Sequence, residues 1–228
     1  LSATPVETQR SSEKPQAVFQ PIRTVASRAI AGFEALARFP TAGKENRAEQ
    51  DTIEIAPDWI AHAPDMVRQS IAFLRELPDR PEYFVQINLS ALELGDRALV
   101  ERIAEIIAQQ KQDSTRIKVE LTEQAALRDE ASAIQALQLL QSTGAGIVLD
   151  DFCAGHSSLV WLTRLPVDGI KLDARLVALL SDAKGRRLLE SLVAPMLDFG
   201  LVITAEGIED LAMLEPLVEM GVQQAQGF

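Results

Sequence analysis

Four apolar segments of this chain end on acidic residues, and this pattern restricts how the chain can fold. The segments are Val119–Glu123, Ile147–Asp151, Ile170–Asp173 and Val202–Glu206. Two further polar positions, Glu34 and Asn88, accompany apolar runs in the same way. Carboxylates beside buried strands are costly unless they are paired or bind a metal. Because a parallel barrel presents its strand ends together on one face, the pattern predicts one oxygen-rich metal centre built from many strands.

Strands and helices alternate along the sequence, which favours parallel pairing with right-handed crossovers. Strands are predicted at residues 17–23, 30–39, 83–89, 117–122, 146–150, 169–172, 201–205 and 223–227. Helices are predicted at residues 59–77, 90–110, 130–142, near 159–162, 186–199 and 210–219. About eight such units close into a modified TIM-like (β/α)8 barrel of the α/β class. A doubly wound sheet is the alternative, but no glycine-rich dinucleotide fingerprint follows an early strand.

Length and charge limit the domain organisation and the partners. The 228 residues suit one large domain, in which residues 1–16 are expected to form a polar linker and residues 17–228 a barrel without a closing C-terminal helix. The formal net charge of −11 disfavours DNA or RNA polymers and anionic membranes as partners. The single cysteine, Cys153, permits no internal disulfide and no cysteine-rich zinc site.

The hydropathy of the chain bears on its location. No apolar run approaches the roughly 20 residues of a membrane span, so no direct membrane insertion by this segment is expected. We therefore expect a cytoplasmic location, either free or as the cytoplasmic domain of a membrane-anchored protein.

Eight short blocks in a fixed order resemble the EAL-domain family of cyclic-di-GMP phosphodiesterases. The blocks are Phe19–Ile22, Phe33–Phe39, Ile87–Ala91, Glu120–Glu123, Asp150–Phe152, Ile170–Asp173, Ala205–Glu209 and Gln226–Phe228. The triplet that names the family is Glu34-Ala35-Leu36. The resemblance implies a modified barrel, hydrolysis of cyclic-di-GMP to linear pGpG, and Mg²⁺ or Mn²⁺ as cofactor. Ca²⁺ is expected to support binding without turnover, and control of motility or biofilm is typical of the family.

The resemblance also implies roles for individual side chains. The metal ligands are expected to be Glu34, Asn88, Glu120, Asp150 and Asp151. The catalytic residues are expected to be Glu206, Lys171 and Asp151, with Lys171 beside the attacking water and Glu206 as the candidate for taking its proton. Substrate contacts are expected from Gln20, Leu36, Arg38, Asp173 and Gln226, and Glu123 is expected to brace the loop after Asp151.

Each of these residues has a simpler interpretation when it is taken alone. Glu34 is then an ordinary edge-strand or surface glutamate, and Asn88 is a capping or turn residue. Lys171 is then an ion-pair partner of Asp173, and the pair Asp150–Asp151 caps a following helix. The joint order of these residues along the chain, rather than any single position, favours the functional interpretation.

Two segments depart from the family pattern. In the loop after the paired aspartates, Cys153 stands where a glycine is usual and His156 where a tyrosine is usual. Glycine adopts positive φ at little cost, so the replacement bears on the second metal site and the dimer interface to which this loop is linked in the family. Residues 41–51 are polar and are followed by Ile53-Glu54-Ile55-Ala56-Pro57, where an isoleucine-proline and alanine-glutamate pattern is usual.

These departures leave three functional hypotheses. The first is a metal-dependent cyclic-di-GMP phosphodiesterase, which is favoured because the ligand set is complete. The second is a cyclic-di-GMP receptor with weak or no turnover that signals to a protein partner, with a homodimer as a further expectation. The third is an unrelated barrel with an acidic mouth.

Overall fold

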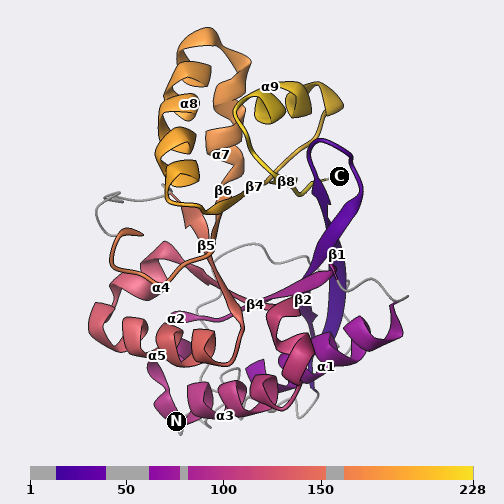
Figure 1. Cartoon of the computed structure of the whole chain (residues 1–228), viewed down its shortest axis with the longest axis vertical. Coiled ribbons are helices and arrows are strands. Elements are labelled where there is room, and N and C mark those ends of the chain that lie inside the picture. The colour runs from indigo at the N-terminus through magenta and orange to yellow at the C-terminus, as the bar shows by residue number, and fades with distance from the viewer. Residues whose placement is uncertain (1–13, 40–61, 78–81, 153–161, 228) are drawn as a thin grey trace, which may run out of the picture.

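The computed structural model describes residues 14–39, 62–77, 82–152 and 162–227, which form a closed barrel (Figure 1). Its strands are β1 (Gln16–Thr24), β2 (Ile30–Arg38), β3 (Phe84–Asn88), β4 (Ile117–Thr122), β5 (Gly146–Phe152), β6 (Gly169–Leu172), β7 (Val202–Ala205) and β8 (Gln224–Ala225). Strands pair in sequence order and are parallel from β2 to β8, whereas β1 is antiparallel to both of its neighbours. The predicted TIM-like barrel is confirmed, with its first strand reversed by a hairpin.

Helices surround the barrel on its outside. They are α1 (Ala63–Glu76), α2 (Ala91–Gly95), α3 (Arg97–Ala108), α4 (Glu123–Leu127), α5 (Glu130–Ser142), α7 (Ala174–Val177), α8 (Ala183–Asp198) and α9 (Leu214–Glu219). Short 3-10 turns cover Lys111–Arg116, Ala178–Ser181 and Leu211–Met213. The sequence did not predict α4 and α7, because helices this short show no helical period. The helix predicted near residues 159–162 lies almost entirely outside the described residues.

The prediction of a single helix over residues 90–110 is wrong, because the chain forms α2 and α3 with a break between them. The predicted capping box opens α2: the Ser90 hydroxyl accepts from the Glu93 amide, and the Glu93 carboxylate accepts from the Ser90 amide at 2.8 Å. Asp96 then opens α3, since its Oδ1 accepts a hydrogen bond from the Leu99 amide at 3.1 Å. Apolar residues recur through both helices, so periodicity alone does not reveal the break.

Alternation along the strands separates a polar barrel interior from an apolar outer layer. β2 and β6 are not neighbours in the sheet, so the contact between Glu34 and Lys171 can form only across the interior. The intervening strand residues face outward and pack against the helices. This layer includes Val85, Ile87, Val119, Leu121, Ile147, Leu149, Ile170, Leu172 and Ile203 from strands, and Val67, Ile71, Ile103, Leu137, Leu140, Leu189 and Met196 from helices. The apolar core therefore lies between the sheet and the helices and leaves the interior free for polar chemistry.

The start of β1 is fixed against α1. The Gln69 side chain donates to the Pro15 carbonyl at 3.0 Å and accepts from the Ala17 amide at 2.9 Å, and Lys14 pairs with Asp65 at 3.0 Å. Residues 1–13 of the predicted linker lie outside the described part of the chain. Among the described helices, none combines the length and the hydropathy needed to cross a membrane.

Asp96→Ala should destabilise the domain, because the substitution removes the oxygen that caps α3. We expect a loss of about 1 kcal/mol in the free energy of unfolding, which lowers the Tm by about 2–4 °C in a domain of this size. Thermal unfolding followed by circular dichroism measures the change. Asp96→Ser keeps a capping oxygen and is the control. Equal Tm values for wild type and Asp96→Ala would contradict the assigned cap.

Candidate active site

The Lys171 ammonium lies at the centre of a carboxylate cluster at one end of the barrel. Its side chain is 1% exposed, and Nζ lies 2.6 Å from Glu120 Oε1 and 2.6 Å from Glu206 Oε1. The same atom is 3.1 Å from Glu34 Oε2 and 3.9 Å from Asp150 Oδ1. The four acids come from β4, the end of β7, β2 and β5. The structure therefore brings together the strand-end carboxylates that the sequence pattern singled out.

Glu34 is held by amide donors as well as by the ammonium. Asn88 Nδ2 donates to Glu34 Oε1 at 2.8 Å, and Gln226 Nε2 donates to Glu34 Oε2 at 2.7 Å. Glu34 is 7% exposed, so the alternative of an ordinary surface glutamate is wrong. Asn88 is not the helix cap either, since Ser90 fills that role.

A bulge in β5 brings two consecutive aspartates to the cluster. The pairing with β6 shifts between Leu149 and Phe152, so that Asp150 and Asp151 together lie opposite Lys171. In a regular strand, consecutive side chains point to opposite faces, and a bulge relaxes this rule. Asp151 has φ of 53°, in the left-handed region. Such conformations in non-glycine residues concentrate at functional sites.

Burial and mutual repulsion shift the pKa values of the cluster. Burial raises the pKa of the Glu120 carboxyl well above its usual range and that of Glu206 to about 7. Burial and the neighbouring Asp150 also raise the pKa of Asp151. Burial alone would lower the pKa of Lys171, but the surrounding carboxylates raise it well above its usual range. One ammonium cannot neutralise all these acids, so the cluster must retain protons or bind further cations.

The donor set fits hard divalent cations. Carboxylate and amide oxygens are the ligands that Mg²⁺ and Mn²⁺ prefer. Glu120 Oε2 and Asp150 Oδ1 are buried and have no hydrogen-bond partner among the described residues, and a cation would satisfy both oxygens. No three His, Cys, Asp or Glu side chains of the described part are yet arranged as a metal site. The Lys171 ammonium lies between the acids, so metal binding requires them to turn away from it.

Three predicted substrate contacts lie on the β1–β2 side of the mouth. Gln20 is directly opposite Glu34 in the antiparallel pairing, and Leu36 is directly opposite Val18. Arg38 ends β2, and its guanidinium donates to the preceding carbonyl oxygen at 3.1 Å. Val18, which pairs with Leu36, is 46% exposed.

Asp173 lies on the opposite side of the mouth and caps α7. Its Oδ1 accepts from the Arg175 backbone amide at 2.8 Å and from Arg175 Nε at 2.7 Å. The alternative in which Asp173 is the ion-pair partner of Lys171 is therefore wrong. The sequence reasoning missed Arg175, whose exposed side chain adds a cation at this rim.

A further buried polar side chain, that of Gln86, faces the barrel interior close to the carboxylates. Gln86 occupies the inward face of β3 one step below Asn88, is 1% exposed, and pairs in register with Glu34 on β2. Its Oε1 has no hydrogen-bond partner within the described residues. The period-two alternation of β3 is the signal that could have identified Gln86.

The predictions for two loops fall on residues outside the described part of the chain. Glu123 opens α4 and is 3% exposed, so its carboxylate is buried next to β4. The loop that Glu123 was predicted to brace, including Cys153 and His156, lies outside the described residues. The same holds for residues 41–57.

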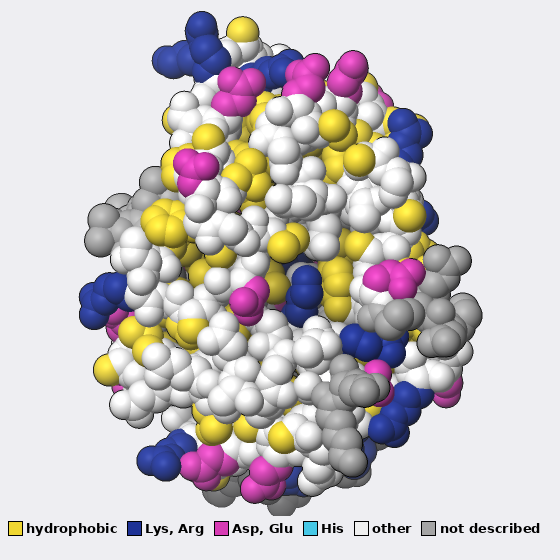
Figure 2. Space-filling model, viewed as in Figure 1, with side chains coloured by type: hydrophobic (Ala, Val, Ile, Leu, Met, Phe, Trp, Pro, Cys, Tyr) yellow, Lys and Arg dark blue, Asp and Glu magenta, His cyan; other side chains and the backbone are white. Residues whose placement is uncertain are grey.

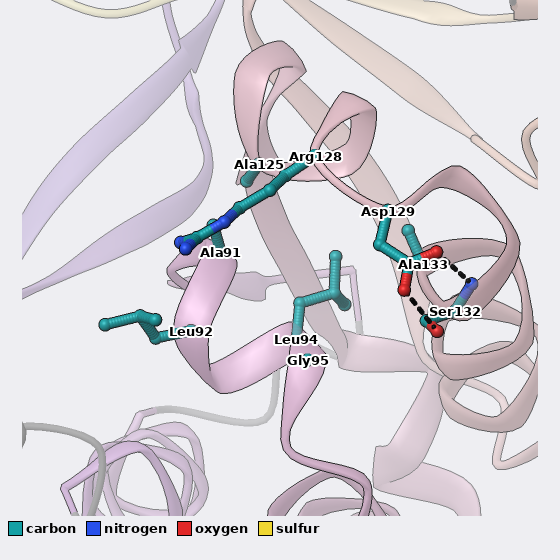
Figure 3. A pocket seen from close by; sticks show the side chains of 9 residues that line it. All are labelled: Ala91, Leu92, Leu94, Gly95, Ala125, Arg128, Asp129, Ser132 and Ala133. Atoms are coloured by element: carbon teal, nitrogen blue, oxygen red, sulfur yellow. Dashed lines mark hydrogen bonds between the residues drawn. The ribbon is translucent and has the colours of Figure 1, made fainter.

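A separate hollow of about 320 Å³ opens outside the barrel (Figure 3). It is lined by Ala91, Leu92, Leu94, Gly95, Ala125, Arg128, Asp129, Ser132 and Ala133, from α2, α4 and the start of α5. The Asp129 carboxylate is engaged by the Ser132 amide at 3.2 Å and hydroxyl at 2.8 Å. No member of the Lys171 cluster lines this hollow, so the chemistry belongs to the barrel mouth.

The chain thus combines a TIM-like barrel with a lysine-centred carboxylate cluster at its mouth, and this donor set suits hard divalent cations. The sequence profile of the EAL domain matches residues 6–228, and the chain belongs to the EAL domain family.

Relatives and solved structures agree with this assignment. The chain is 30% identical over 224 residues to protein Rv1357c of Mycobacterium tuberculosis, covering 92% of this chain and 72% of that protein. It matches Klebsiella pneumoniae BlrP1 in a manganese and cyclic-di-GMP complex with a TM-score of 0.80 and 26% identity, over 96% of this chain and 56% of that chain. It matches the Pseudomonas aeruginosa MucR phosphodiesterase in complex with cyclic-di-GMP with a TM-score of 0.75 and 26% identity, over 94% of this chain and 90% of that chain.

Metal binding at the mouth should strengthen as the pH rises through about 7. Glu206, whose pKa is raised to about 7, is protonated below that pH, and its negative charge above that pH would add to the attraction of the mouth for a cation. In the metal-free protein, the contribution of Glu206 to the free energy of unfolding changes with pH in the opposite direction. The raised pKa gives Glu206 a stabilising contribution that is fully present below the ordinary glutamate pKa of 4.5 and is lost as the pH rises to about 7.

Thermal unfolding at acidic and at mildly alkaline pH, with and without Mn²⁺, tests both effects. We expect the gain in Tm from Mn²⁺ to be larger at the higher pH. Glu206→Gln should flatten the pH dependence of the metal-free protein. A Mn²⁺ effect of equal size at both pH values would show that Glu206 does not control metal binding.

Proposed function

We propose that this domain binds cyclic-di-GMP at the barrel mouth and hydrolyses one phosphodiester bond to give linear pGpG, with Mg²⁺ or Mn²⁺ as cofactor. The observation that carries the proposal is the contact of one buried ammonium with four acids from separate strands. A structural role alone does not require four acids around one lysine, because buried, unneutralised carboxylates are destabilising. The manganese and cyclic-di-GMP complex of BlrP1 supports the same ligand and cofactor.

The proposal divides the metal ligands of the cluster into two sets, one for each of two cations. Glu34, Asn88, Glu120 and Asp150 would hold one cation, and Asp150, Asp151 and Glu206 would hold the other. When bound, two such cations supply an activated water and offset charge on the phosphate and the leaving oxygen. The β5 bulge supports this division, because it gives Asp150 and Asp151 to the mouth together.

In the proposed hydrolysis, Lys171 would supply a positive charge and Glu206 would accept a proton. Glu206 is 24% exposed at its side chain, so water reaches it, and its carboxylate is the candidate for accepting the proton of the attacking water. Lys171 keeps its proton, because the surrounding acids raise its pKa. Its fixed positive charge would oppose the negative charge that develops on the phosphate oxygens in the transition state.

The rim residues would position the substrate. Gln20 and Gln226 are assigned to a guanine end, Arg38 to a phosphate and Leu36 to an apolar contact, with Asp173 on the opposite rim. Gln226 already donates to Glu34, and its Oε1 is buried without a partner among the described residues. This geometry supports a second role for Gln226, in which it orients Glu34 for the metal.

A receptor that binds cyclic-di-GMP without efficient turnover is the second candidate function. It is favoured by Cys153 and His156, which replace the glycine and tyrosine usual in that loop. In this case the domain would signal to a protein partner or through a homodimer, in the cytoplasm. In either case residues 17–228 would act as the functional unit and residues 1–16 as a linker.

The first experiment incubates the purified domain with cyclic-di-GMP and Mn²⁺ and separates free and bound nucleotides by chromatography. The enzyme proposal expects pGpG over many turnovers. Intact cyclic-di-GMP retained by the protein would establish the receptor, and no binding would overturn both. Glu206→Gln and Lys171→Met should each lower kcat by about 100-fold or more. Glu215→Gln, on the exposed face of α9, is the matched control and should keep wild-type turnover.

The altered loop makes a separate prediction about rate. Cys153→Gly combined with His156→Tyr restores the usual residues of that loop and should raise kcat if the loop limits turnover. The measurement is initial-rate kinetics of pGpG formation for the double variant and for each single variant. If kcat does not rise, the limit lies elsewhere, and residues 41–57 become the next segment to restore.

A further inference from the structure

Two stripes of side chains on α1 and α3 line a groove on the outside of the barrel. On α1 the stripe consists of Arg68, Ile71, Ala72 and Arg75. On α3 it consists of Arg102, Glu105 and Ile106 and continues past the end of the helix with Gln109 and then Gln110. Both stripes have the spacing i, i+3, i+4 and i+7, which places their members on one face of a helix. The two helices pack side by side, and the groove between them has a volume of about 610 Å³.

The groove is positively charged on a chain whose formal net charge is −11. Three arginines line it against a single glutamate. Arg102 has no hydrogen-bond or ion-pair partner among the described residues. Arg75 donates to the neutral Gln110 side chain at 2.7 Å, so its charge is not neutralised. Only the third arginine of the groove, Arg68, has a carboxylate partner within the described part, namely Asp65 at 3.1 Å.

Apolar side chains lie at the floor of the groove and are largely buried, whereas most of its exposed lining is polar. Ile71 is 5% exposed and Ile106 is 9% exposed, and the small side chain of Ala72 lies between the flanking arginines on α1. Arg68 and Arg75 are seven residues apart, which corresponds to about 10 Å along the helix axis, or two turns. A molecule that fills this groove must present anionic groups to the rims over that length, and it can place small apolar groups where it reaches the floor.

An amphipathic acidic polypeptide segment has this combination of groups. Arginine binds carboxylates through paired, directional hydrogen bonds, and helix-in-groove recognition uses apolar residues at the spacing of this floor. A nucleic-acid backbone offers no aliphatic side chains for the floor. It would also meet a surface on which acidic and basic side chains are interspersed, as Figure 2 shows for one face, rather than the extended basic surface that polymers of phosphate require.

We propose that the groove between α1 and α3 is a docking site for an acidic amphipathic segment of a partner protein. Apolar side chains of the partner pack on Ile71, Ala72 and Ile106, and its carboxylates pair with Arg75 and Arg102. The groove lies outside the barrel, and none of its residues belongs to the Lys171 cluster. The proposal therefore does not depend on nucleotide hydrolysis.

The test uses a fluorescein-labelled peptide of about 18 residues with leucines at i, i+3, i+4 and i+7 and glutamates elsewhere, and fluorescence anisotropy with the whole domain. We expect a dissociation constant in the micromolar range that rises with salt. Arg75→Glu and Arg102→Glu should each weaken binding by about 10-fold or more, and Ala72→Trp, which fills the groove, should also weaken it. Arg97→Glu is the matched control, since Arg97 lies on α3, is 90% exposed and does not line the groove.

Several results would overturn the proposal. These are no binding, equal binding of a scrambled peptide of the same composition, or equal affinity of wild type and the groove variants. Tighter binding of a single-stranded oligonucleotide of the same charge would replace the protein partner by a nucleic acid. A wild-type dimer in sedimentation velocity that Arg102→Glu dissociates would assign the groove to a second copy of this chain. Circular dichroism confirms that each variant is folded, and these surface substitutions should leave any pGpG formation unchanged.

Discussion

The placement of the Lys171 ammonium among four carboxylates is the interaction on which the barrel mouth depends. In most barrels of this type, layers of branched apolar side chains fill the interior. Here Glu34, Gln86, Glu120 and Lys171 occupy that space, all nearly inaccessible to solvent. Such a polar interior contributes little hydrophobic stabilisation, so the fold relies on the apolar layer between the outer faces of the strands and the helices. Removing the positive charge would leave buried acids without a counter-ion, which is strongly destabilising.

The β5 bulge connects this electrostatic arrangement to the segment in which the sequence departs from its family. Asp150 and Asp151 can both serve the mouth only because the pairing shifts there and Asp151 adopts a left-handed backbone. The next residues after β5 begin the loop that contains Cys153 and His156. A change in that loop acts through a backbone that is already strained, and the orientation of Asp151 is the first property that such a change would alter. This link is the physical basis for the proposal that the loop would influence turnover.

The sequence predicted the barrel and most of the site because both depend on short-range signals. Period-two alternation and acidic strand ends located β4, β5, β6 and β7, and the Ser90–Glu93 capping box marked the start of α2. The break at Asp96 was missed because apolar spacing continues through it. The partners of Lys171 and Asp173 were not predictable, since they depend on strand register and side-chain direction across the barrel. Gln86 was missed although the alternation of β3 places it on the inward face, because its unpaired Oε1 among the described residues is evident only in the folded barrel.

The distribution of charge would allow an acidic chain to recognise anions at the two proposed sites. A phosphodiester that approaches the mouth meets at least four carboxylates and one ammonium, so productive binding requires further positive charge, which bound divalent cations would provide. The groove between α1 and α3 uses a different source, because its charge comes from arginines that are exposed or paired with neutral groups. Mobile ions screen exposed charges beyond roughly 8–10 Å at physiological salt. One small domain can therefore carry an acidic barrel mouth and a positively charged groove. Affinity at the mouth should then depend on divalent cations and pH, whereas affinity at the groove should depend on ionic strength alone.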